Sequence, residues 1–149
     1  MNNISKMLPH DYPMVLIDKV TEFDSENHYV VSSTTIKESM PFFDKTINGM
    51  SSVVGIEFMA QTIGCYSYLK RKKIKPRMGF LLGTRMYNNS IEFFENGKTY
   101  TIKAEEVYND NKLCAFGCQI FDENQEEIAC ATINAYQPEN IEEYLNKNE

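Results

Sequence analysis

Two polar side chains interrupt an apolar stretch of this sequence, and their types and spacing are suited to acid–base chemistry. From Val53 to Leu69 nearly every position is apolar or small, yet Glu57 and Gln61 lie within the stretch. Residues four positions apart share a face of a helix, so this carboxyl group and this amide are predicted neighbours. An ionised carboxylate in an apolar interior is costly unless it is paired or borders a cleft. We therefore predict that Glu57 is catalytic and that Gln61 orients it.

Each candidate also has a structural interpretation that stays open at this point. Glu57 could form an ion pair with Arg85, and Gln61 could be a core amide whose hydrogen bonds are satisfied. The functional interpretation of Glu57 is favoured because a carboxylate inside a buried helix is unusual. The chain has two histidines. His10 could reach the mouth of an active site or could bond a strand, whereas His28 opens a polar strand and is expected to be solvated.

The stretch that carries Glu57 is predicted to be one long, buried helix. A helix that is apolar all round is a buried helix, and its 17 residues would span roughly 25 Å, the thickness of a small domain. Ser51 or Ser52 can cap its start. The cations that begin at Lys70 suit the end of the helix dipole, and Pro76 stops any continuation. The stretch is too short to span a membrane, and its central charge argues against that as well.

Strands are predicted on both sides of this helix, because the flanking segments are rich in β-branched and alternating apolar residues. The expected strands cover Met14–Phe23, His28–Ile36, Met78–Arg85, Tyr87 with Ile91–Phe94, Thr99–Tyr108, Leu113–Phe121 and Ile128–Tyr136. Residues 1–7 are expected to be loosely ordered, residues 41–49 to form a loop, and the tail from Pro138 to be a frayed helix.

The fold class that follows is α+β, with an antiparallel sheet wrapped around one long central helix. A single helix that is apolar on all sides, among strands joined by short turns, must be enclosed by the sheet. One sheet cannot cover the whole helix, so self-association is favoured. The 149 residues are expected to form a single domain, 1–149.

Composition narrows the function further. The net charge of −6 argues against general nucleic-acid binding. Cys114 and Cys118 would lie about 13 Å apart along a strand, too far for one metal ion or one disulfide. We therefore expect no metal site, no cofactor and four reduced thiols, and, because the N-terminus has no apolar signal region, a cytoplasmic protein.

Five segments of the sequence together resemble one enzyme family. These are Leu8–Val20 (with Leu-Pro-His at its start), Pro41-Phe42-Phe43, Gly55–Gln61 (Gly-Ile-Glu-Phe-Met-Ala-Gln), Gly79–Tyr87 (beginning Gly-Phe-Leu-Leu-Gly-Thr-Arg) and Ala131–Pro138. Over roughly residues 8–138 the chain resembles the hot-dog fold 3-hydroxyacyl-(acyl-carrier-protein) dehydratases of fatty-acid synthesis. It is more similar to their relatives in aryl-polyene pigment clusters.

The resemblance implies a sheet-wrapped helix, chains joined side by side, active sites at the dimer interface and an acyl carrier protein as partner. It points to Glu57, which matches the carboxylate of the family's central helix, as a catalytic residue, and His10, from the proline-bracketed segment, is the second catalytic candidate. The expected substrate contacts are Gln61, Ser52, Val53, Tyr12 and Gly83. One departure matters: the fatty-acid dehydratases carry a catalytic histidine after Pro-Phe-Phe, and residues 44–49 of this chain contain none.

Three functions remain in competition. The first is a dehydratase subunit acting on carrier-bound 3-hydroxyacyl or polyenoyl chains, as a homodimer or with a second hot-dog subunit that supplies the histidine. The second is a hot-dog thioesterase, in which a carboxylate of the central helix activates water or attacks the thioester. The third is a non-catalytic partner subunit. The basic run from Lys70 to Arg77 is either a docking patch for an acidic carrier protein or a solvated helix end.

Overall fold

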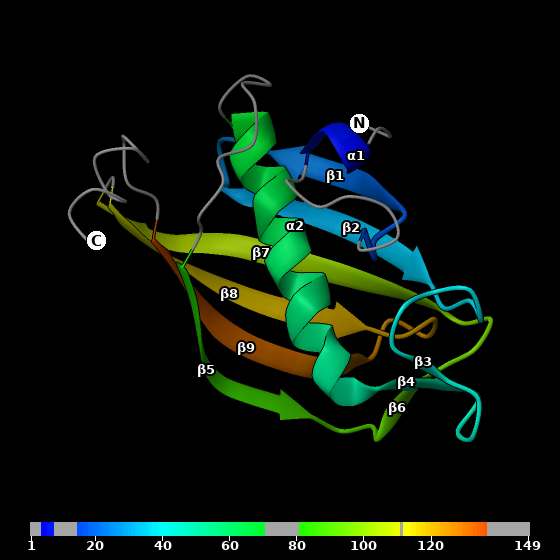
Figure 1. Ribbon diagram of the computed structural model, residues 1–149. Coiled ribbons are helices and arrows are strands. Elements are labelled where there is room, and N and C mark those ends of the chain that lie inside the picture. Colours follow the sequence, from blue (N-terminus) through cyan, green and yellow to red (C-terminus); the bar gives the residue numbers. More distant parts are fainter. Residues whose placement is uncertain (1–3, 8–14, 71–80, 111, 137–149) are drawn as a thin grey trace, which may run out of the picture.

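The computed structural model describes residues 4–7, 15–70, 81–110 and 112–136 (Figure 1). Its helices are α1 (Ile4–Met7) and α2 (Gly55–Lys70), with the short 3₁₀ turn η1 (Ser52–Val54) leading directly into α2. Its strands are β1 (Lys19–Asp24), β2 (Tyr29–Thr35), β3 (Phe43–Asp44), β4 (Gly49–Ser51), β5 (Leu81–Asn89), β6 (Phe93–Glu95), β7 (Thr99–Asn109), β8 (Leu113–Phe121) and β9 (Glu127–Tyr136).

The sheet and the long helix are arranged as the sequence predicts. Six antiparallel strands form one sheet in the order β1-β2-β7-β8-β9-β5. Figure 1 shows α2 crossing one face of this sheet, and the helix packs against both edge strands, β1 and β5. A second, small sheet in the order β3-β4-β6 lies beside the start of α2. The prediction of an antiparallel sheet wrapped around one helix is confirmed.

The strands form because alternate residues are apolar and meet the helix. In β8, Cys114, Phe116, Cys118 and Ile120 are buried, and the residues between them are half-buried. This alternation is typical of a strand with one face on the core. Cys65, Cys114 and Cys118 are buried, Cys130 is half-buried, and all four are free thiols in the structure.

Aromatic rings fill the core around both ends of the helix. Near its start, the rings of Phe58 and Phe94 lie 5.2 Å apart, and those of Phe94 and Tyr100 lie 4.9 Å apart. Towards its end, Tyr66 contacts Phe116 edge-on at 5.6 Å. Such pairs add about 1 kcal/mol each beyond the apolar area that they bury.

The sheet leaves one stripe of the helix partly uncovered. Within α2 only Lys70 is exposed, but Ile56, Ala60, Gly64 and Ser67 are half-buried. Their spacing of three or four residues places them along one face. The expectation that one sheet cannot cover this helix is confirmed for the described residues.

Several predicted boundaries need correction. The first strand was expected over Met14–Phe23, but β1 begins only at Lys19, and Leu16 and Ile17 are buried without being paired in a strand. Residues 4–7 are not loose: they form a helical turn whose Ile4 and Met7 side chains join the core. The expected loop over residues 41–49 contains β3 and the start of β4.

The segment after the helix is also divided differently from the prediction. Tyr87 was assigned to a separate short strand, but it belongs to β5, which runs on to Asn89. A bulge between Arg85 and Asn88 breaks the alternation that the sequence pattern relies on. Two expectations lie outside the described residues: the strand start at 78–80 and the helical tail from Pro138.

Gly55 permits the close approach of β5 to the start of α2. A Cβ atom on this residue would lie 2.3 Å from the Tyr87 hydroxyl oxygen and 3.0 Å from Cδ1 of Ile120. We expect Gly55→Ala to lower the free energy of unfolding by about 2 kcal/mol in urea titrations, because the added methyl group overpacks the core. In the control, Gly117→Ala, the Cβ would be 3.9 Å from Val107, and we expect a change within about 0.5 kcal/mol. Equal effects would contradict the close packing at Gly55.

The four thiols should differ in reactivity, with the more deeply buried ones reacting more slowly. Burial raises the pKa values of Cys65 and Cys118 to about 12, and it raises that of Cys114. Because the thiolate is the reactive form, we expect iodoacetamide at pH 8 to alkylate the half-buried Cys130 first, as read by peptide mass spectrometry. In urea all four should react at similar rates. Early labelling of Cys65 or Cys118 in the folded protein would contradict this packing.

Candidate functional site

The candidate site is built around Glu57, which lies in the first turn of α2. Its side chain is half-buried, and Gln61, one turn further along, has 0% exposure. The Gln61 Nε2 group donates a hydrogen bond to Oε1 of Glu57 at 3.2 Å. The structure thus brings together the two residues that the helical spacing predicted to be neighbours.

The orientation of the Gln61 amide is determined by a distant backbone group. The N–H of Leu16 donates to Oε1 of Gln61 at 2.8 Å, in a buried bond between residues 45 positions apart. A backbone N–H can only donate, so the amide oxygen must face Leu16 and the NH₂ group must face Glu57. Gln61 is therefore both a satisfied core amide and a fixed donor to the carboxyl group.

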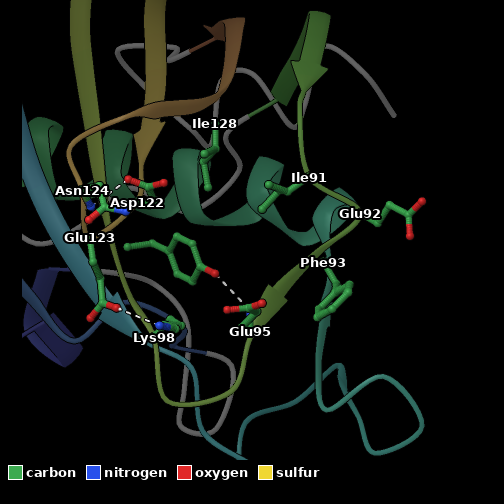
Figure 2. Close-up of a pocket in the computed structure, with 10 residues that line it drawn as sticks. Ile91, Glu92, Phe93, Glu95, Lys98, Asp122, Glu123, Asn124 and Ile128 are labelled. Atoms are coloured by element: carbon green, nitrogen blue, oxygen red, sulfur yellow. Dashed lines mark hydrogen bonds and ion pairs between the residues drawn. The ribbon is translucent and has the colours of Figure 1, made fainter.

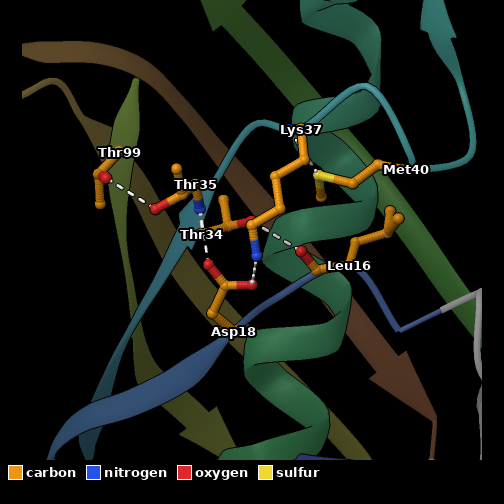
Figure 3. A network of polar contacts seen from close by, with 7 residues as sticks. All are labelled: Leu16, Asp18, Thr34, Thr35, Lys37, Met40 and Thr99. Atoms are coloured by element: carbon orange, nitrogen blue, oxygen red, sulfur yellow. Dashed lines mark hydrogen bonds and ion pairs between the residues drawn. The ribbon is translucent and has the colours of Figure 1, made fainter. Parts of the chain in front are cut away.

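A polar network holds Leu16 and its neighbours in place (Figure 3). The Thr34 hydroxyl donates to the carbonyl oxygen of Leu16 at 2.7 Å. Asp18 accepts from the N–H of Thr35 at 2.8 Å and lies 3.6 Å from the Lys37 ammonium group. Because both backbone groups of Leu16 are bonded, one to α2 and one to β2, the donor that orients Gln61 is itself rigid.

A second polar contact lies next to this network between the helix and β2. Ser32 and Thr62 are fully buried and their hydroxyl oxygens lie 2.7 Å apart. Thr62 also donates to the carbonyl oxygen of Phe58 at 2.8 Å. These bonds fix the register of the helix against β2, because any slip would leave buried polar groups unpaired.

The start of the helix is held by β5 and β6. The Ser52 N–H donates to the carbonyl oxygen of Glu92 at 3.0 Å, and the Tyr87 hydroxyl donates to the carbonyl oxygen of Ser52 at 2.5 Å. The Val53 N–H makes a longer bond, 3.4 Å, to the hydroxyl oxygen of Ser51, and the Val53 side chain is 65% exposed. At this helix start, the Ser52 N–H makes a normal hydrogen bond to a backbone carbonyl oxygen. The Val53 N–H makes only a longer, weaker one to a hydroxyl oxygen.

Tyr87 is the residue in this region that sequence reasoning did not single out. It belonged to the Gly79–Tyr87 segment of the family resemblance, but no local pattern connects it to a helix that begins 35 residues earlier at Ser52. Burial raises the pKa of Tyr87 to about 12, so its hydroxyl stays protonated and able to donate at neutral pH.

The structure describes only some of the other residues that the sequence predicted for the site. Gly83 lies in β5, is exposed, and has open space where a Cβ would be. His10 and Tyr12 lie outside the described residues, as does the Arg85 side chain that was considered as an ion-pair partner of Glu57. His28 is exposed, as expected of a solvated histidine.

A cavity of about 390 Å³ lies away from Glu57, between β6 and the turn that joins β8 to β9 (Figure 2). Ile91, Tyr100 and Ile128 supply its apolar lining, and its rim carries Lys98 paired with Glu123 at 3.6 Å. Neither Glu57 nor Gln61 lines it. In the part of the chain that the structure describes, no group of histidine, cysteine or carboxylate side chains could hold a metal ion, and no helix is long and apolar enough to cross a membrane.

An antiparallel sheet wrapped around one long helix is the hot-dog fold, and similar solved structures share it. The family model described as ApeP dehydratase, ApeP-like, matches residues 2–146, so the chain belongs to the ApeP-like dehydratase family. The dehydratase heterocomplex ApeI:P from Xenorhabdus doucetiae has a similar structure, with a TM-score of 0.83 and 25% identity, covering 98% of this chain and 97% of that chain.

Two further matches cover only part of a longer protein or share the fold alone. A bifunctional enzyme LpxC/FabZ from Chlorobaculum tepidum is 37% identical over 86 residues, which are 56% of this chain but only 18% of that protein. The chain therefore spans under a fifth of the length of this curated relative. The Streptococcus mutans protein smu.793, solved with acetyl-CoA, shares the fold alone, with a TM-score of 0.60 and 15% identity over 87% of this chain and 94% of that chain.

We expect Gln61→Leu to lower the free energy of unfolding by about 2 kcal/mol, because it leaves the buried N–H of Leu16 without its acceptor. The matched control is Gln119→Leu, which breaks a solvent-exposed glutamine–glutamate contact to Glu127 and should cost less than about 0.5 kcal/mol. Urea unfolding monitored by circular dichroism would measure both changes. A loss at Gln61 no greater than that at Gln119 would contradict the role of the amide as the buried link.

Proposed function

We propose that this chain is a dehydratase subunit that removes water from 3-hydroxyacyl chains attached to an acyl carrier protein, in polyene or fatty-acid-like synthesis. The observation that carries the proposal is the half-buried carboxyl group of Glu57, oriented at the start of the central helix by the buried Gln61 amide. Membership of a dehydratase family supports the reaction class.

Dehydration of a 3-hydroxyacyl thioester requires one group to remove the α-proton and another to protonate the departing hydroxyl group. We assign the second role to Glu57, which gives its proton to the oxygen as the C–O bond breaks and water leaves. Charge develops on the thioester oxygen as the α-proton is removed, and an N–H at a helix start can stabilise it. The Val53 N–H is the donor assigned here, with Ser52 in the same turn and Gly83 and Tyr12 as further substrate contacts.

The base is assigned to a histidine, either His10 or one supplied by a partner subunit. Between β3 and β4, Asp44 accepts from the Thr46 N–H at 2.9 Å and from its hydroxyl at 2.6 Å, which closes a tight turn without a histidine. His10 precedes Leu16 by six residues, and six residues span at most about 20 Å. Because Leu16 is bonded to Gln61, the chain length permits His10 to approach Glu57, and this supports the assignment of His10 as one candidate base.

A second hot-dog subunit is proposed to complete the site. The half-buried face of α2 and the open side of the edge strand β5, as described above, both offer surface for it. The similar structure from Xenorhabdus doucetiae is described as a dehydratase heterocomplex, which supports partnering between hot-dog subunits. The sequence is compatible with a homodimer or a heterodimer.

The carrier protein is proposed to dock near the C-terminal end of α2, where the basic run begins. Within the described residues, Lys70 donates to the Glu106 carboxylate at 2.8 Å and lies over the Tyr66 ring. The rest of the run, to Arg77, lies outside the described residues. Acidic carrier proteins are attracted to such charge, and the attraction is screened by salt.

The absence of a histidine from residues 41–52 favours one competing function, that of a non-catalytic partner that stabilises an active subunit. In that case the Glu57 carboxyl group is structural. A thioesterase would differ in its product, because it would release free thiol from the carrier protein instead of water from the acyl chain.

The test is the addition of water to a trans-2-enoyl acyl carrier protein, followed by mass spectrometry, with this chain alone and with a purified ApeI-type hot-dog subunit. We expect Glu57→Gln to lower the rate at least about 100-fold, because the proton donor is lost. The control is Glu105→Gln, at an exposed carboxylate on β7 next to the buried Ala104.

The outcomes separate the competing functions. Turnover by the chain alone would identify His10 as the base, and turnover only in the mixture would place the histidine on the partner. If Glu57→Gln left the rate of the mixture unchanged, the catalytic role of Glu57 would be refuted and the scaffold role supported. Free thiol as the product would identify a thioesterase.

A further inference from the structure

The edge strand β5 contains a bulge that turns one side chain out and the next one in. The register against β9 shifts between Arg85 and Asn88. Within this bulge Met86 has φ of +54° and is 82% exposed, whereas the Tyr87 side chain is half-buried and packs against the core. A positive φ is unfavourable for a bulky residue and persists where surrounding contacts impose it. Bulges of this kind re-aim side chains, and they are enriched beside active sites.

The residue that the bulge turns inward reaches the first residue of the helix start. The Tyr87 hydroxyl donates to the Ser52 carbonyl oxygen at 2.5 Å, and the Ser52 N–H donates to the Glu92 carbonyl oxygen at 3.0 Å. Both backbone polar groups of Ser52 are therefore bonded to the β5–β6 region. The missing side chain of Gly55 leaves the space that the Tyr87 hydroxyl occupies, since a Cβ there would be 2.3 Å away.

We infer that Tyr87 is a positioning residue: from the bulge of the edge strand it fixes the helix start that carries Val53 and Glu57. This inference rests on the proposed function for its catalytic consequence, but the positioning itself is independent of the reaction. Glu57 lies five residues after Ser52, and the η1 turn and the first turn of α2 connect them without a break. A displacement of Ser52 therefore moves the N–H of Val53 and the carboxyl group of Glu57 together.

The strand that carries Tyr87 is also at the open edge of the sheet. Among the described strands, β5 pairs only with β9. A second subunit that pairs along this edge would contact the bulge directly, and Tyr87 would transmit the placement of that strand to the helix start.

The chain offers a matched control for removing the Tyr87 hydroxyl group. Tyr100 is a buried tyrosine, Tyr87 is half-buried, and the hydroxyl of each bonds a backbone group: that of Tyr100 accepts from the Glu95 N–H at 2.9 Å. Burial raises the pKa values of both phenols, so both are protonated at neutral pH. Tyr87→Phe and Tyr100→Phe each delete one buried hydroxyl group and its bond, but only the first deletion is at the helix start.

The experiment compares these two variants by amide hydrogen exchange and by kinetics. In Tyr87→Phe we expect exchange of the amides of residues 55–59 to accelerate about tenfold in the free chain, and in Tyr100→Phe to change less than about threefold. In whichever assembly turns over the enoyl carrier protein, Tyr87→Phe should lower kcat about tenfold with KM within about twofold, because the catalytic groups are displaced and substrate contacts remain.

Hydrogen exchange tests the positioning role of Tyr87, and kinetics test its catalytic consequence, so the two parts of the inference can be overturned separately. If exchange at residues 55–59 is the same in Tyr87→Phe as in the wild type or the Tyr100→Phe control, the positioning role is overturned, whatever the activity. If exchange accelerates and the wild-type protein shows no dehydratase chemistry in any assembly, Tyr87 still positions the helix and the proposed function is what fails. If exchange accelerates while kcat of an active assembly is unchanged, the catalytic consequence is overturned.

Discussion

The buried amide of Gln61 is the contact on which the arrangement of the site depends. It accepts from the Leu16 N–H and donates to Glu57, and it has no exposed surface. A buried backbone N–H needs a hydrogen-bond acceptor. The Leu16 N–H therefore determines that the amide oxygen of Gln61 faces Leu16. That choice in turn presents a donor to the carboxyl group. The hydrogen bond that the Leu16 N–H needs in the folded protein thereby also orients the carboxyl group of Glu57, which is proposed to do the chemistry.

The helix that carries Glu57 is held from two sides by different kinds of bond. On the side of β2, Thr34 and Ser32 anchor Leu16 and Thr62. On the side of β5, the hydroxyl of Tyr87 bonds the helix start. A catalytic group on a rigid element, supported by bonded neighbours, keeps its geometry better than one on a loop. The half-buried carboxyl group is therefore positioned before any substrate binds.

The uncovered face of the helix connects the fold to the family. An isolated sheet cannot enclose a helix that is apolar all round, and here Ile56, Ala60 and Gly64 remain half-buried. The chain belongs to the ApeP-like dehydratases, and a similar structure is the dehydratase heterocomplex ApeI:P. Residues 44–49, which include the Asp44–Thr46 turn, also lack the histidine that the resemblance to the fatty-acid dehydratases implies after Pro-Phe-Phe. Both observations support the second subunit proposed above.

Local patterns in the sequence were sufficient for several features that depend on neighbours along the chain. The buried helix, the bounds of β8 and the pairing of Glu57 with Gln61 follow from periods of 3.6 and 2 residues. The pattern of strands around one buried helix predicted the fold, and the family resemblance added the reaction class. The tertiary structure alone decided the contacts between distant residues: Leu16 with Gln61 across 45 positions, and Tyr87 with Ser52 across 35. It also decided the bulge that turns Tyr87 inward, because a one-residue shift in strand register inverts which side chains face the core, and no local pattern records such a shift.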